Sequence, residues 1–168
     1  MNEWVAISGT WRTVTADVEN DVRGEVRNII EKGDGIVTGG ALGVDYIATD
    51  EVLKADPAAR HIRIILPTPL SVYANHYFRR AEEGVISAGQ AFELVHQLME
   101  VKAKNPEALV EMGFNACNQE SYYARNGKVI DAADRLLAFQ VNDSAGTQDA
   151  IDKAKAAAKP VLQRKYQV

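Results

Sequence analysis

The stretch Val37-Thr38-Gly39-Gly40-Ala41-Leu42-Gly43-Val44-Asp45 joins two apolar patterns of different period through three glycines in five residues. Before it, the residues from Gly35 to Thr38 form a short β-branched run that is typical of a strand. After it, apolar residues recur at helical spacing up to Val52, and the pattern stops before Pro57. A strand that turns through glycines into a helix is the repeating unit of a parallel α/β sheet.

Similar units lie on both sides of this stretch. An apolar run from Trp4 to Ile7 ends at Ser8-Gly9-Thr10, and a capped helical pattern follows it as far as Gly33. A third apolar run, Ile62 to Leu66, ends at Pro67, a residue that cannot donate to a strand ladder. The first part of the chain therefore predicts the element order βαβαβ.

The rest of the chain is helical at first and then alternates again. From about Ala74 to Ala132 the pattern is helical, and it includes Leu109 beyond Pro106. The elements expected after it are a strand at Arg135 to Phe139, a polar loop at Val141 to Thr147, a helix from about Gln148 to Ala157 and a strand at Pro160 to Gln163.

These patterns predict an α/β fold of Rossmann-like type, a doubly wound, mostly parallel sheet with helices on both faces and a helical insertion at about residues 85–118. Since the chain has 168 residues and no linker-like segment, we expect residues 1–168 to form one domain. Nearly half of the residues are apolar, which is enough for a core without metal or disulfide support.

Charge and cysteine content exclude several classes of protein. The chain has 19 basic and 23 acidic residues, and this net charge of −4 argues against broad attraction to nucleic acid. The single Cys117 cannot form an internal disulfide, and the amino terminus lacks a signal-peptide pattern. We therefore expect a cytoplasmic protein without a membrane span. His61, His76 and His96 are scattered, so we expect no metal site and no cofactor.

Three loops are expected at the carboxyl ends of the strands, where parallel α/β sheets bind ligands. In the first, Ser8 and Thr10 flank Gly9, which lets backbone amides approach an anion, and Trp11 and Arg12 follow. Arg12 would bind the anion and Trp11 would stack on a base. The alternative is a tight turn with a surface arginine.

The second loop is the opening stretch itself. Thr38, Gly39, Gly40 and Gly43 combine missing β-carbons with the start of a helix, an arrangement that suits phosphate. Glycines at strand ends also serve packing alone. Asp45, in the first turn of the helix, either stabilises the helix start or binds a sugar hydroxyl.

The third loop contains Ser144, Gly146 and Thr147, whose hydroxyls either cap the following helix or bind phosphate. On the preceding helix, Glu120 is a candidate acid or base, and Arg125 and Asn126 follow it; a solvated helix face explains all three equally well. Cys117 is better explained as a buried small hydrophobe than as a nucleophile. The expected ligand-binding residues are Ser8, Gly9, Thr10, Arg12, Thr38, Gly39, Gly40, Gly43, Asp45, Arg125, Asn126, Ser144, Gly146 and Thr147.

Taken together, these loops resemble the SLOG superfamily, which unites Smf/DprA and Lonely Guy proteins on a Rossmann-like fold that binds nucleotide-derived ligands or DNA. The segment Ser8-Gly9-Thr10-Trp11-Arg12 looks like the GSR element of the DNA-processing branch, and Thr38 to Asp45 resembles its SGxAxGxD element. Arg125-Asn126 is similar to its arginine-asparagine pair, and Ser144 to Thr147 to its late serine-glycine loop. The resemblance covers most of the chain outside the helical insertion.

The resemblance also shows where this chain departs from its relatives. Phosphoribohydrolases of the Lonely Guy branch carry a PGGxGTxxE pattern whose glutamate supports N-glycosidic cleavage, and here Ala150 stands at that position, with Asp149 one place early. Cleavage would therefore depend on another carboxylate, for which Glu120 and Asp45 are the candidates. DprA proteins usually carry additional domains.

The resemblance implies a protein that binds a nucleotide or nucleotide derivative, with N-glycosidic hydrolysis as a possible activity. One alternative is a nucleotide sensor without turnover. Another is a single-stranded DNA-binding protein, with Arg60, Arg63, Arg79 and Arg80 as a basic track and Trp11, Tyr73 or Tyr77 for base stacking. Family members commonly form homodimers, so a homodimer is expected.

Overall fold

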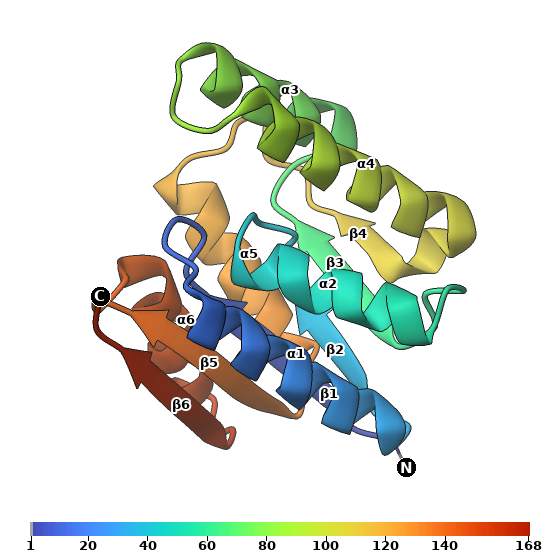
Figure 1. Ribbon diagram of the computed structural model, residues 1–168, viewed down its shortest axis with the longest axis vertical. Coiled ribbons are helices and arrows are strands. Elements are labelled where there is room, and N and C mark those ends of the chain that lie inside the picture. The colour runs from blue at the N-terminus through green and yellow to red at the C-terminus, as the bar shows by residue number, and fades with distance from the viewer. Residues whose placement is uncertain (1) are drawn as a thin grey trace.

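The computed structural model describes residues 2–168, which form one six-stranded sheet with helices on both faces (Figure 1). The strands are β1 (Trp4–Gly9), β2 (Gly35–Thr38), β3 (Ile62–Leu66), β4 (Leu109–Glu111), β5 (Arg135–Val141) and β6 (Val161–Tyr166). The helices are α1 (Ala16–Glu31), α2 (Val44–Ala55), α3 (Leu70–Glu82), α4 (Ala88–Lys104), α5 (Gln119–Asp131) and α6 (Ala145–Ala156), with a short 3₁₀ turn at Pro106–Ala108.

The strand order in the sheet is β4-β3-β2-β1-β5-β6, and all five pairings are parallel. The chain leaves β1 toward β2 on one side and later returns to place β5 on the other side of β1. The strand order therefore reverses between β1 and β5, which makes this edge the topological switch point where such sheets bind ligands. The predicted doubly wound, Rossmann-like fold is confirmed, and the sheet is parallel throughout.

The two faces of the sheet bury separate apolar clusters, because successive side chains of each strand point to opposite faces. On β1, Val5 and Ile7 pack under α1 and α2, whereas Ala6 packs with residues of α5 and α6. Figure 1 shows α1 and α2 on the side of the sheet that faces the viewer. The α3–α4 hairpin packs over the end of the sheet near β3 and β4.

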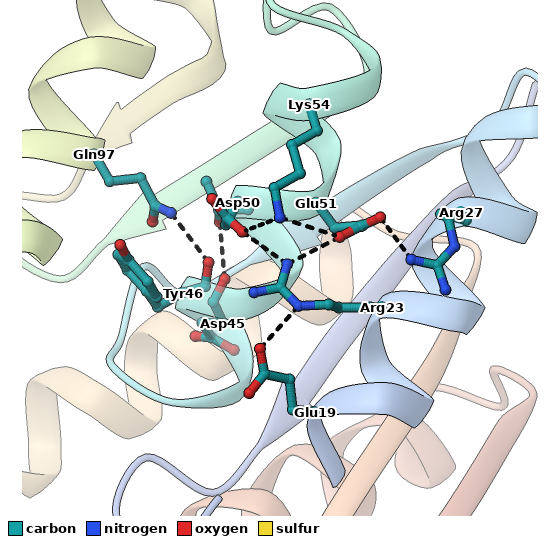
Figure 2. A network of polar contacts seen from close by, with 10 residues as sticks. Glu19, Arg23, Arg27, Asp45, Tyr46, Asp50, Glu51, Lys54 and Gln97 are labelled. Carbon is teal, nitrogen blue, oxygen red and sulfur yellow. Dashed lines mark hydrogen bonds and ion pairs between the residues drawn. The ribbon is translucent and has the colours of Figure 1, made fainter. Parts of the chain in front are cut away.

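An ion-pair network joins α1 to α2 (Figure 2). Arg23 donates to Asp50 at 2.7 Å and to Glu51 at 2.9 Å, and Arg27 also donates to Glu51 at 2.9 Å. The Glu51 side chain is only 8% exposed. Burial alone would raise the pKa of Glu51, but the hydrogen bonds from Arg23 and Arg27 outweigh it and lower that pKa.

The expectation of a helical pattern from about Ala74 to Ala132 is contradicted most clearly at β4. Residues Leu109–Glu111 form β4, an edge strand whose Leu109 lies opposite Ile64 of β3. The segment of about 85–118 that was expected as a helical insertion thus contains α4 and a strand of the sheet. Three residues are too few for a period of two to show in the sequence, and Leu109 is apolar in either pattern.

The last helix also begins earlier than expected. The segment from Val141 to Thr147 was expected as a loop, but α6 starts at Ala145, so Ser144 is its N-cap and Thr147 lies in its first turn. Asn142 and Asp143 make the turn with φ of 47° and 54°, a conformation that these two residue types adopt more readily than most. Among residues 2–168 no helix is both long enough and apolar enough to span a membrane.

Candidate functional site

A cavity of about 650 Å³ opens at the carboxyl ends of β1 and β5. It brings together most residues of the three loops expected to bind a ligand. Those that line it are Ser8, Gly9, Thr10, Arg12, Gly39, Asp45, Arg125, Asn126, Ser144, Gly146 and Thr147. The other expected residues, Thr38, Gly40, Gly43 and Glu120, lie outside the lining of this cavity as the structure describes it.

The amides of the glycine-rich loop after β2 are already hydrogen-bonded within the loop. Gly39 and Ala41 donate their amides to the same oxygen of Asp45, Oδ2, at 3.1 and 3.2 Å. The Gly40 amide donates to Thr38 Oγ1 at 3.3 Å. A ligand would have to displace these contacts to bind the loop amides, so this loop is not a ready phosphate cradle.

At Gly39, Gly40 and Gly43, the space that a β-carbon would need is occupied by other atoms of the protein. A β-carbon on Gly39 would lie 2.5 Å from the guanidinium carbon of Arg125, and one on Gly40 would lie 2.6 Å from Leu66. Gly43 has φ +73°, and a β-carbon there would lie 2.3 Å from the carbonyl oxygen of Thr10. The glycines therefore let the β1 loop, the β2 loop and α5 approach one another, which is the packing alternative stated above.

Arg125 and Asp45 form the buried polar centre under the cavity, each 7% exposed. Arg125 donates through Nη1 to the Gly39 carbonyl and through Nε to Asn126 Oδ1. Burial raises the pKa of Asp45 to about 6, although the charge of Arg125 and the two loop amides act in the opposite direction. Asp45 thus fixes the loop by accepting its amides, and this explains the carboxylate without a sugar ligand.

The start of α6 is the place where backbone amides remain free. The sequence Ser-Ala-Gly begins both α4, at Ser87, and α6, at Ser144. Ser87 caps α4 by accepting the Gln90 amide at 3.0 Å, but the Ser144 hydroxyl donates to Thr147 Oγ1 at 2.7 Å instead. Within residues 2–168, the amides of Ala145, Gly146 and Thr147 meet no hydrogen-bond acceptor.

These amides face the cavity, since Ser144 to Thr147 all line it. A helix start with free amides and a positive dipole end favours an anion. A β-carbon on Gly146 would meet no atom of the described chain within 4 Å, so open space lies in front of this residue. Asn126 supports the arrangement from α5, because its Nδ2 donates to the Gly146 carbonyl at 3.3 Å and to Asp149 at 3.0 Å.

The β1 loop supplies positive charge and an aromatic ring to the same cavity. Arg12 is exposed and lies over the ring of Trp11, with 4.4 Å between the guanidinium carbon and the ring centroid. Thr10 is buried and accepts the amides of Arg12 and Thr13 at 3.4 and 3.5 Å, which shapes the turn. The Ser8 side chain is half-buried at the cavity wall.

The sequence did not predict that aromatic side chains from two helices form one wall of the cavity. Residues of α3 and α5 line it, among them His76, Tyr122 and Tyr123. His76 Nε2 lies 3.2 Å from the Tyr122 hydroxyl, and burial together with Arg80 and Arg79 lowers the pKa of His76, so this imidazole is neutral at pH 7. Tyr122 and Tyr123 adjoin Arg125 in the sequence, but only the packing of α3 on α5 reveals their common wall.

The cavity offers little to a hydrolytic reaction. Among its lining residues in the described chain, Asp45 is the one carboxylate, and its Oδ2 already accepts two amides. Glu120 is exposed outside the cavity, and Asp149 pairs with Lys153 and Asn126. Cys117 lines the cavity half-buried, where burial raises the pKa of its thiol and so keeps it protonated. In residues 2–168 no three potential metal ligands lie together.

No protein-family model matches the sequence, and no curated protein matches it significantly. Solved structures do resemble it. A structure of DNA processing protein A from Helicobacter pylori, reported for its single-stranded DNA binding mode, superposes with a TM-score of 0.69 at 24% identity. The match covers 96% of this chain and 64% of that one.

Two further solved structures have a similar fold. DNA processing protein A from Streptococcus pneumoniae gives a TM-score of 0.51 at 13% identity over 96% of this chain and 58% of that one. The structural-genomics target TM1055 gives a TM-score of 0.57 at 16% identity over 95% of this chain and 72% of that one. At these identities the likeness concerns the fold. The chain therefore has a Rossmann-like fold similar to that of DNA processing protein A, as the sequence patterns predict.

Proposed function

We propose that this protein binds a phosphorylated nucleoside in the cavity at the switch point, with the phosphate at the start of α6. The observation that carries the proposal is the helix start itself, where three free amides line a cavity and the N-cap serine leaves them uncapped. Arg12 lines the same cavity and supplies the charge that a phosphate needs. The volume of about 650 Å³ lies within the usual range for small-molecule sites.

The aromatic wall supports a nucleoside rather than a simple sugar phosphate. Trp11, Tyr122 and Tyr123 line the cavity, and flat rings of this kind stack on nucleobases. The neutral imidazole of His76 and the hydroxyl of Tyr122 add polar groups that discriminate between bases by hydrogen bonding.

The bound nucleoside is expected to stay intact. Cleavage of an N-glycosidic bond needs a carboxylate that stabilises positive charge at C1′ or activates water. Asp45 is occupied by the glycine loop, and Glu120 lies outside the cavity. The protein therefore acts as a sensor or carrier of the nucleotide, and incubation should leave the nucleotide without release of free base, as measured by chromatography.

Single-stranded DNA is a second candidate ligand, favoured by the fold of the Helicobacter pylori protein and by Trp11 and Arg12 at the cavity mouth. The four arginines suggested as a basic track do not support it. Arg60 and Arg63 lie at the amino end of β3, where Arg63 stacks on Trp4, whereas Arg80 lines the cavity at the carboxyl edge. A net charge of −4 further disfavours a long backbone contact.

The test is thermal unfolding against the nucleoside monophosphates, inorganic phosphate and a short single-stranded oligonucleotide. A ligand at 100 times its Kd stabilises by about 2.7 kcal/mol, which raises the Tm of a chain of this size by about 5–10 °C. The decisive variant is Gly146→Asp, because a carboxylate in the first turn of α6 stabilises the helix but repels phosphate. We expect its Tm without ligand to be unchanged or higher and its response to nucleotide to be lost.

Gly89→Asp is the matched control. Gly89 holds the same second position in α4, behind the same Ser-Ala pair, and the substitution changes net charge equally. Gly89→Asp should keep the full nucleotide response. Equal responses from both variants would place the phosphate elsewhere, and a rise with the oligonucleotide alone would favour the DNA-binding function.

A further inference from the structure

A series of hydrogen bonds between side-chain amides, centred on the buried Gln140, runs from the edge strand β6 to the start of α6. Gln163 of β6 donates through Nε2 to Gln140 Oε1 at 2.6 Å. Gln140 of β5 in turn donates through Nε2 to the Ser144 carbonyl at 3.3 Å and to Gln148 Oε1 at 3.1 Å. Gln140 is 1% exposed, so water does not compete for these contacts.

The direction of these hydrogen bonds is fixed at the α6 end, by the Ser144 carbonyl. A glutamine amide can turn by 180° and exchange its donor for its acceptor. Because the Ser144 carbonyl can only accept, Gln140 must present its NH₂ group to α6 and its oxygen to Gln163, which then donates. Gln140 therefore meets two acceptors, Ser144 O and Gln148 Oε1, with its two donor hydrogens.

Holding the Ser144 carbonyl also aims the next amide. The Ser144 oxygen accepts the Gln148 amide at 3.0 Å in addition to Gln140. In a planar trans peptide the C=O and the following N–H point in opposite directions, so a fixed Ser144 carbonyl fixes the Ala145 amide toward the cavity. Asn126 holds the Gly146 carbonyl in the same way, and with it the Thr147 amide.

We propose that Gln140 and Gln163 are positioning residues for the phosphate site, and that Gln163 controls ligand affinity from the edge strand without contacting the ligand. This inference rests on the proposed function, because it assigns the residues that aim the free amides of α6. Both glutamines lie outside the lining of the cavity in the described chain, which separates them from binding residues. Their role follows from three contacts of correct donor and acceptor sense, one that Gln140 accepts and two that it donates.

The variant that tests it is Gln163→Glu. At pH 7 a glutamate can only accept, so Gln140 must turn its NH₂ group toward residue 163 and its oxygen toward Ser144 O, where two acceptors repel. The affinity for inorganic phosphate, followed by NMR titration of the Gly146 amide, should fall about threefold to tenfold. In a protein that already carries Gln140→Leu, the substitution Gln163→Glu should have no further effect on phosphate affinity, because the hydrogen bonds between residue 163 and α6 are already lost.

Lys165→Gln is the matched control. Lys165 lies two residues along β6 on the same side of the strand, is exposed, and gives the same change in net charge. Its phosphate affinity should equal that of the unaltered protein. A merely structural role of Gln163 would lower the Tm and leave the affinity of the folded protein unchanged, and that result would overturn the inference.

A second readout needs no ligand and separates this inference from the proposed function. In the ligand-free protein, Gln163→Glu should shift the Ala145 amide resonance and speed its hydrogen exchange, whereas Lys165→Gln should do neither. If the unaltered protein binds neither inorganic phosphate nor any nucleotide, the proposed function fails. The Ala145 amide of Gln163→Glu, compared with that of Lys165→Gln, still decides the positioning role. Unchanged Ala145 behaviour in Gln163→Glu would reject that role.

Discussion

At the scale of single residues, several candidate site residues make contacts within the protein that their motifs did not predict. Asp45 was a candidate catalytic carboxylate, but it accepts two amides of the glycine loop beside the buried Arg125. Gly39, Gly40 and Gly43 were phosphate-loop candidates, yet their missing β-carbons make room for Arg125, Leu66 and Thr10. A sequence shows that a position needs a small residue or an acid, but the neighbour that imposes this need comes from elsewhere in the chain.

The buried carboxylate predicts an unusual dependence of stability on pH. The pKa of Asp45 rises from 3.8 to about 6 in the folded protein, so the folded state holds this proton more tightly than the unfolded state. Stability from this group is therefore fully present below about pH 4 and is lost as the pH rises through about 6. The full difference corresponds to about 3 kcal/mol of unfolding free energy.

The comparison of wild type with Asp45→Asn by urea unfolding measures this effect. Asparagine keeps an oxygen for the two loop amides but does not titrate. We expect the stability of wild type relative to Asp45→Asn to fall between pH 4 and pH 6. A difference that is flat over this range would mean that burial does not raise the pKa of Asp45 and that this carboxylate is ionised throughout.

At the scale of helices and strands, the sequence predicted the elements whose patterns are long and missed the short one. The apolar spacing of α1 and the β-branched runs of β1, β2 and β3 appear at nearly their observed bounds. The sequence did not predict β4, because this strand is only three residues long and its position depends on pairing with β3. The early start of α6 was missed for a similar reason, since polar residues suit a loop and a first helical turn equally.

The pairing of α1 with α2 predicts a clear difference between two arginines. Arg23, whose side chain is 20% exposed, binds Glu19, Asp50 and Glu51 at the centre of the network in Figure 2. Arg23→Met leaves the buried Glu51 with less compensation and should lower the unfolding free energy by about 2 kcal/mol. Urea unfolding at pH 7 measures it.

Arg135→Met is the control, because Arg135 pairs with Glu3 at 3.2 Å near the surface. It should cost less than about 1 kcal/mol. The loss in Arg23→Met should shrink below pH 4, where the carboxylates with lowered pKa values become protonated. Equal losses from the two variants would show that the α1–α2 network contributes no more than a surface pair.

At the scale of the whole molecule, the fold was predictable and the chemistry of the site only in part. Alternating strands and helices determine a parallel sheet, and a parallel sheet determines the edge where loops converge. Eleven of the fifteen expected site residues line one cavity for this reason. Which loop keeps free amides was not predictable, since it depends on the rotamer of Ser144 and on contacts from Asp45, Gln140 and Asn126.

The position of the phosphate is therefore the decisive observation, and a crystal structure with the nucleoside monophosphate that raises the Tm most would show it directly. We predict phosphate oxygens within about 3 Å of the Ala145, Gly146 and Thr147 amides, as hydrogen bonds require, with Arg12 turned toward them and the Asp45 contacts to Gly39 and Ala41 intact. A phosphate bound to the amides of Gly39 to Ala41, with Asp45 displaced, would contradict the assignment of the α6 start as the anion site.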